Sequence, residues 1–367
     1  MRTCTAGVCG TSNAPAGTTC TQDGTACDGS GTCTVVVSVV RVGDGTTTLT
    51  SGVAAPVFVE RHLVSGALLG SPIALPVAPN GANQPLTLSG TASSEGALWR
   101  STDGHYLSLA GYAAAPGTMG VVNTASASTN RVVARIDATG TVDTTTRLNT
   151  GFSGNNVRGA ASVDGTAFWL SGTAGSGSPA GIFYVPFGMT GGMQILSTPN
   201  NTRVVAIYDG QLYASAASGT FVNVFTVGSG LPTTPGQTAT SLPGMPTAAG
   251  PSPYAFALLD RNPDVPGVDT LYVADDRSLP AGGVQKWTFD GTTWSLVTTL
   301  NSGLSTGARG LTAFQAGANV TLVATTGEAT QNRLVVVVDD GSASPPVSTV
   351  ATAPPNTMFH GVALAPQ

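Results

Sequence analysis

The sequence predicts an all-β chain, a six-bladed β-propeller closed by its C-terminal strand and preceded by a small disulfide-rich arm. Three observations predict this fold. A short motif recurs along the chain, in which an apolar run follows a charged residue and glycine and ends near Asp-Gly. Short apolar runs alternate with turns rich in Gly, Pro and Thr, and no window keeps a helical period.

The motif sets the number of blades. Its six copies begin at residues 95, 158, 203, 254, 309 and 360, and the copies at 203 and 254 lack the glycine. A repeat of roughly 40 to 50 residues made of short strands is typical of a propeller blade. The last copy has no strands after it, so we expect it to pair with the first strands of the chain and close the ring, which leaves no open sheet edge.

Residues 1–33 are predicted to form the arm. All five cysteines lie there, Cys4, Cys9, Cys20, Cys27 and Cys33, and the segment has almost no core-forming residues. Disulfides are therefore its expected source of rigidity, with two bonds and one unpaired or intermolecular thiol as the minimum. Residues 20–33 form a three-cysteine unit, and Cys4 and Cys9 resemble the end of a preceding unit. This pattern favours a chain processed from a longer secreted precursor.

Residues 34–367 are predicted to form the propeller. Strands are expected at 35–42, 57–63 and 67–75, followed by a loop from 76 to 85. The second blade has strands at 106–112, 131–136 and 141–148, with a long excursion from 113 to 129. Later strands are expected at 167–172 and 181–186, then at 255–259, 270–274, 284–289 and 294–300, and finally at 311–314, 319–325 and 334–338.

The residue that opens each copy of the motif is predicted to lie at one mouth of the central channel. These candidate site residues are Glu95, Arg158, Arg203, Tyr254, Arg309 and His360. Arginine suits a carboxylate or sulfate because its planar fork donates two hydrogen bonds in fixed geometry. The alternative is that the arginines satisfy loop carbonyls and channel waters. The four tryptophans, Trp99, Trp169, Trp287 and Trp294, are expected to pack between blades, and one of them could instead stack on a sugar.

Composition argues against several function classes. The net charge is −5 and Lys286 is the single lysine, so nucleic acid is not an expected partner. The longest apolar runs are of strand length, so no membrane span is expected. No metal site, cofactor or Ser-His-Asp set is predicted from three histidines and scattered turn aspartates. A sialidase-like hydrolase is a minority interpretation, because the segment 290–294 only approximates the repeated sialidase box.

Two parts of the chain resemble known proteins. Residues 14–20 and 27–33 resemble cysteine repeats of secreted myxobacterial proteins, and residues 40–45, 95–98 and 110–112 resemble a group of uncharacterised secreted bacterial propeller proteins. The resemblance implies an extracellular location and the propeller fold, and it brings no catalytic residues.

Together these observations predict a non-enzymatic extracellular or cell-surface protein acting in adhesion or as a matrix component. Charged residues make up only 9% of the chain, which lowers repulsion between copies, so copies of the chain itself are the expected partners, in a filament or another assembly. The alternative is a receptor for a glycan or anion, or a sialidase-like hydrolase, acting at the channel mouth.

Overall fold

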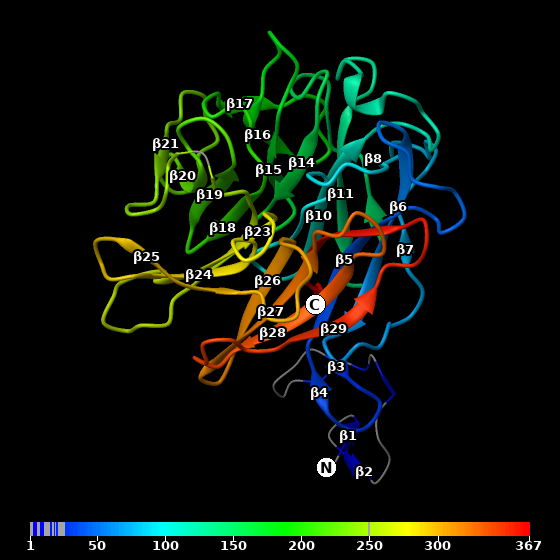
Figure 1. Ribbon diagram of the computed structural model, residues 1–367. Coiled ribbons are helices and arrows are strands. Elements are labelled where there is room, and N and C mark those ends of the chain that lie inside the picture. The colour runs from blue at the N-terminus through cyan, green and yellow to red at the C-terminus, as the bar shows by residue number, and fades with distance from the viewer. Residues whose placement is uncertain are drawn as a thin grey trace.

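The computed structural model describes residues 3–5, 8–10, 15–16, 18, 20, 26–248 and 250–367, with only the backbone given for 3–5 and 8–10. The chain has an all-β, propeller-like fold, with 45% of its residues in strands and 1% in helix (Figure 1). A single turn of 3-10 helix, Val121–Asn123, lies in the predicted excursion. None of the helices in the described ranges is long and apolar enough to cross a membrane.

Four separate antiparallel sheets of four strands each follow one another between residues 157 and 352. Their strands run in sequence order and are β14 (Val157–Ala161), β15 (Ala167–Gly172), β16 (Gly181–Pro186) and β17 (Met193–Leu196); β18 (Val205–Tyr208), β19 (Gln211–Ala216), β20 (Asn223–Val227) and β21 (Ala239–Ser241); β22 (Pro253–Leu259), β23 (Thr270–Asp275), β24 (Gly283–Phe289) and β25 (Trp294–Leu300); β26 (Ala308–Ala316), β27 (Asn319–Thr326), β28 (Arg333–Asp339) and β29 (Val347–Thr352).

The remaining strands of the body form one ten-stranded sheet. One half contains β30 (Met358–Leu364), β5 (Val36–Val42), β6 (Ala54–Leu63) and β7 (Ile73–Ala74), and the other contains β9 (Leu98–Arg100), β10 (Tyr106–Tyr112), β11 (Arg131–Asp137), β12 (Val142–Asp143) and β13 (Arg147–Leu148). The short strand β8 (Thr87–Ser89) pairs with both β6 and β10 and so joins the halves. The sequence did not predict β8, because its three residues carry no periodic pattern.

The predicted pairing of the two chain ends is confirmed. β30 runs antiparallel to β5, with Leu364 opposite Val37 and Met358 opposite Val42. The predicted strands at 106–112, 167–172, 181–186 and 294–300 are also confirmed at both ends. The strand predicted at 67–75 is reduced to β7 and a single bridge between His62 and Leu68, because this segment turns through Gly66 and Gly70, both with positive φ.

Six large clusters of buried side chains each lie between two successive sheets or between the two halves of the ten-stranded sheet. The sixth cluster joins Val323 and Leu334 of the last sheet to Val37 and Val39 of the first. β5 contributes to two clusters, because Val37 and Val39 belong to one while Val40 and Val42 belong to another. Both faces of the strand are buried, which explains its nearly continuous apolar run.

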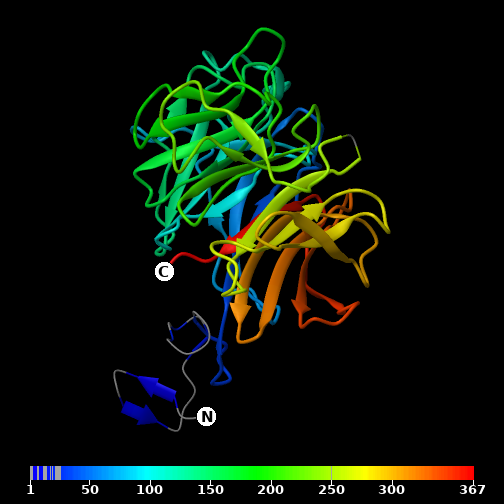
Figure 2. The ribbon, with the colours of Figure 1, turned by 90° about the vertical axis from the view of Figure 1, so that its left-hand side faces the viewer.

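The arm contains β1 (Thr3–Thr5), β2 (Val8–Gly10), β3 (Ala26–Cys27) and β4 (Cys33–Thr34), which form two two-stranded sheets. These strands lie to one side of the body (Figure 2). Ala26 reaches the body, where it belongs to a small cluster with Val36, Leu63 and Ala365. The predicted boundary between arm and propeller at residue 33 stays a prediction.

Candidate functional site

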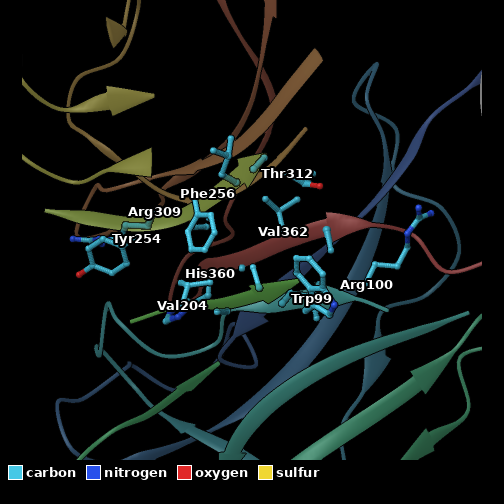
Figure 3. A pocket seen from close by; sticks show the side chains of 18 of the residues that line it. Trp99, Arg100, Val204, Tyr254, Phe256, Arg309, Thr312, His360 and Val362 are labelled. Atoms are coloured by element: carbon cyan, nitrogen blue, oxygen red, sulfur yellow. The ribbon is translucent and has the colours of Figure 1, made fainter. Parts of the chain in front are cut away.

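A cavity of about 250 Å³ lies among the strands β9, β18, β22, β26 and β30. Its walls come from five segments that lie far apart in the sequence, and Figure 3 shows their side chains converging. Contacts between strands that are not hydrogen-bonded neighbours bring these segments together, because β22 contacts β26, β26 contacts β30, and β30 contacts β9.

The middle of the cavity wall is apolar and aromatic. Trp99 packs edge-on against Tyr208, with ring centroids 5.5 Å apart, and Val204, Phe256 and Val362 complete this part of the wall (Figure 3). Trp99 is therefore the tryptophan that lines this cavity. Its indole donates a hydrogen bond from Nε1 to the carbonyl of Ser162 at 3.0 Å, which fixes the ring.

The other three tryptophans are buried, as the sequence predicted. Trp169, Trp287 and Trp294 belong to clusters between sheets.

The six predicted site residues form an unbroken circuit of neighbours in chain order. His360 Nδ1 lies 2.8 Å from the backbone oxygen of Glu95, and the Arg309 guanidinium acts electrostatically on His360. The guanidinium carbons of Arg309 and Arg203 lie 5.9 and 4.0 Å from the centre of the Tyr254 ring. Arg158 interacts electrostatically with both Arg203 and Glu95 and so completes the circuit. Four of the six, Glu95, Tyr254, Arg309 and His360, also line the cavity.

Arg158 and Arg203 donate to nearby loops. Arg158 donates from Nη1 to Asn201 Oδ1 at 2.6 Å and to the carbonyl of Thr202 at 2.8 Å. Arg203 donates from Nη1 to Ser252 Oγ and to the carbonyl of Pro253. Burial, together with the positive charge of Arg203, lowers the pKa of Arg158 to about 10. These contacts match the alternative in which the arginines among the six site residues (the ring) bond to loop carbonyls and hold the loops in place.

Arg309 is the ring arginine that lines the cavity. Its Nε lies 3.4 Å from Asp276 Oδ2, and the two side chains are 21% and 17% exposed. A guanidinium has five N–H donors, so this single long contact leaves most of them available to a ligand.

His360 adds no positive charge to those of the three arginines at pH 7. Burial lowers its pKa to about 4, and the nearby Arg309 charge acts in the same direction. The imidazole is therefore neutral at pH 7. Because a backbone carbonyl only accepts hydrogen bonds, Nδ1 carries the proton that is donated to Glu95. Nε2 is then an acceptor, and it is buried with no hydrogen-bond partner among the described residues.

Glu95 is also a structural residue. Its carboxylate accepts hydrogen bonds from the Tyr112 hydroxyl at 2.5 Å, from Asn156 Nδ2 at 2.5 Å and from the backbone N–H of Ser89 at 2.8 Å. Burial raises the pKa of Glu95 and holds the pKa of Tyr112 well above its usual range. Tyr112 is fully buried, so its hydroxyl is not exposed to solvent.

The sequence missed one charged residue that organises this region. Arg131 is fully buried and donates to the carbonyls of Thr124, Thr129, Phe152 and Asn155. It thereby ties the excursion and the loop before β14 to β11. Position 131 opens a predicted strand, and no sequence pattern distinguishes it from an exposed arginine.

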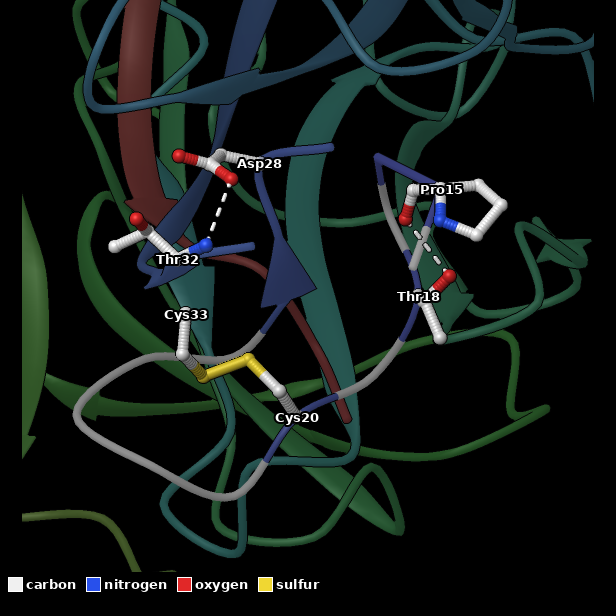
Figure 4. The surroundings of a disulfide bond; sticks show 6 residues. All are labelled: Pro15, Thr18, Cys20, Asp28, Thr32 and Cys33. Carbon is white, nitrogen blue, oxygen red and sulfur yellow. Dashed lines mark hydrogen bonds between the residues drawn. A yellow bond between two sulfur atoms is a disulfide. The ribbon is translucent and has the colours of Figure 1, made fainter. Parts of the chain in front are cut away.

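In the arm, Cys20 and Cys33 form a disulfide with Cα atoms 6.0 Å apart, and Cys27 is a free thiol (Figure 4). The prediction that Cys27 is a disulfide cysteine is therefore wrong. The backbones of Cys4 and Cys9 are directly opposite in the β1–β2 pair, and their side chains lie outside the described residues. No group of three or more potential metal ligands occurs in the described part of the chain.

No family model and no curated protein matches this sequence. Solved structures with partial similarity include a putative 6-phosphogluconolactonase from Bacteroides uniformis, at a TM-score of 0.47 and 13% identity over 87% of this chain and 83% of that one. TolB from Acinetobacter baumannii matches at a TM-score of 0.45 and 12% identity over 89% and 67%. At these TM-scores and identities the similarities carry no information about the activity of this chain.

Proposed function

We propose that residues 34–367 form a closed six-bladed propeller. Three observations support closure: β30 pairs with β5, a shared core joins the last sheet to the first, and the six motif residues are linked around a circuit by a hydrogen bond, cation–π contacts and electrostatic interactions. The two halves of the ten-stranded sheet then count as the first two blades. The cavity is the central channel of this propeller.

We propose further that the protein is an extracellular binding protein whose ligand occupies this channel. The observation that carries the proposal is the contrast between the channel wall and its mouth. The wall is apolar and aromatic, as small-molecule sites are. The ionisable groups at the mouth are largely bonded to the protein itself, which suits positioning and recognition better than acid–base or nucleophilic catalysis. The disulfide supports an oxidising, extracellular location.

A dye-binding experiment tests the channel. The probe is 8-anilinonaphthalene-1-sulfonate, which fluoresces on entering an apolar site. Thr312 lines the cavity, so Thr312→Trp should fill it and abolish dye binding (Figure 3). Thr293→Trp, at an exposed turn, is the matched control and should bind as the native protein does. Equal dye binding by both variants, with unchanged circular dichroism, would contradict the proposal.

A second candidate function is self-assembly into a surface or matrix layer. The outermost strands β17, β21, β25 and β29 of the four separate sheets carry no charged residue. Leu296 and Val297 on β25 are 49% and 55% exposed. Soluble proteins usually protect sheet edges with charge, so an uncharged edge favours pairing with another strand.

Sedimentation at rising concentration tests assembly. We expect Leu296→Lys to shift the protein toward monomer, whereas Thr293→Lys, at an exposed turn outside β25, is the matched control and should leave the assembly unchanged. Deletion of residues 1–33 measures how much the arm contributes to assembly. It should leave a folded monomer if the arm makes the contact between copies. A native protein that sediments as a monomer at every concentration would exclude this second function.

A further inference from the structure

We propose that the channel ligand is an amphiphilic monoanion, an alkyl or aryl chain with one carboxylate. Its carboxylate binds Arg309 and its apolar body lies along Trp99, Phe256 and Val362. This inference rests on the proposed binding function and names the chemical class of the ligand.

The head group is assigned from the free donors at the mouth. Arg309 has one contact of 3.4 Å, to Asp276, and its side chain is 21% exposed, so its guanidinium can present paired N–H groups to a carboxylate. Arg158 and Arg203 are turned to loop oxygens and do not line the cavity. One cation therefore faces the channel from this ring.

The charge of the ligand follows from the neighbours of Arg309. His360 is neutral at pH 7 because burial lowers its pKa to about 4, so it adds no second positive charge. Asp276 already offsets part of the charge of Arg309. The single guanidinium can pair with one carboxylate, a position for which Asp276 competes, whereas a phosphate dianion would bring a second negative charge for which the ring residues offer no further free cation.

The Tyr254 ring lies beside Arg309, and its hydroxyl makes only a 3.5 Å contact with Ser93 Oγ. It can therefore donate to the same carboxylate.

The body of the ligand is assigned from the wall. A sugar carries a hydroxyl on most of its carbons, and each hydroxyl buried without a partner costs affinity. The side chains of Trp99, Phe256 and Val362 offer such hydroxyls no acceptor and no free donor, since their single polar group, the Trp99 N–H, is already donated to the carbonyl of Ser162. An alkyl or aryl body loses nothing by this burial and gains the transfer of its apolar surface from water. The wall therefore favours an apolar chain over the glycan that the sequence suggested.

The cavity follows the segment that carries β9. Glu95 and Arg100, five positions apart on this segment, both line it. In Figure 3, Arg309 and Arg100 lie at opposite ends of the cavity, with Phe256, Val362 and Trp99 between them. Arg100 is held there by the carbonyl of Ala365 at 3.3 Å.

The test uses a medium-chain fatty acid with a terminal bromine, because bromine quenches a tryptophan that it contacts. We expect saturable quenching of the fluorescence of Trp99. Trp99→Phe should remove the quenching while calorimetry still detects binding. Arg309→Gln should weaken binding by about ten- to a hundredfold, since a hydrogen-bonded charge is lost. Arg147→Gln, in which the replaced arginine bonds to Thr190 away from the channel, is the matched control.

Two comparisons guard against a folding artefact. Asp276→Asn removes the carboxylate that competes for Arg309, so it should tighten binding of the acid. The corresponding bromo-alcohol should bind more weakly than the acid in the native protein and should be indifferent to Arg309→Gln.

An acid that binds no better than the alcohol, or equally well to Arg309→Gln, would overturn the inference. If the dye enters the channel but the acid does not, the binding function stands and this ligand class fails. If neither the dye nor the acid binds, both proposals fail.

Discussion

Gly361→Ala perturbs the place where β30 crosses β9. A Cβ at residue 361 would lie 2.2 Å from the backbone N of Leu98, 2.5 Å from the carbonyl oxygen of Gly96 and 2.8 Å from the carbonyl carbon of Ala97. All three atoms belong to backbone, so no side chain can turn aside. β30 and β9 would have to separate by about 1 Å or more, and overpacking of this kind costs about 3 kcal/mol.

Urea unfolding followed by tryptophan fluorescence measures this cost. Gly175→Ala is the matched control, because residue 175 also lacks a positive φ and its nearest neighbour would be 3.5 Å from the new Cβ. We expect that variant to stay within about 0.5 kcal/mol of the native protein or to gain slightly. Gly159→Ala, with contacts of 3.1 and 3.3 Å, should fall between them. Equal unfolding free energies for Gly361→Ala and Gly175→Ala would refute the close packing of inner strands.

Three further predictions concern stability and the arm. Arg131→Met should lower the unfolding free energy by about 4 kcal/mol in urea, because it leaves several buried carbonyls unpaired, and Arg147→Met in the same sheet should change it little. His360 has a pKa of about 4 in the folded protein against an ordinary 6.5, so its contribution to the free energy of unfolding is complete above pH 6.5 and is lost as the pH falls toward 4. His360→Gln should therefore reduce the change in unfolding free energy between pH 6.5 and 4 by about 3 kcal/mol. Identical pH profiles for the variant and the native protein would contradict the buried neutral imidazole. Iodoacetamide should label Cys27 in the native protein and spare Cys20 and Cys33, as mass spectrometry of the digest can show; labelling of Cys33 at the same rate would contradict the Cys20–Cys33 bond.

Most strands could be predicted from the sequence because both faces of each blade are buried. A strand such as β10 places Leu107 and Leu109 in one cluster and Ala110 and Tyr112 in the next, so its apolar run is continuous and ends at turn residues. β7 and β8 were among the failures, and the strand predicted at 141–148 is divided into β12 and β13. β7 and β8 are two and three residues long, and their pairing depends on partners that lie elsewhere in the chain.

The role of the motif glycines could not be predicted from the sequence either. The sequence shows only that a glycine follows the first residue in four copies of the motif. In the structure, Gly361 lies against the backbone of β9, and Gly310 lies 2.5 Å, measured from an added Cβ, from the carbonyl oxygen of His360. These glycines are required because neighbouring inner strands approach one another closely, and that contact joins segments far apart in the chain.

The sequence by itself determined the all-β class, the repeat, the pairing of the chain ends and the identity of the six opening residues, because these depend on local pattern and composition. Only the tertiary structure decided what those residues do. It turned Arg158 and Arg203 to loop oxygens, made His360 neutral by burial, and left Arg309 facing an apolar cavity. Charge state and free donors depend on which groups surround a side chain in space, and a linear pattern does not contain that information.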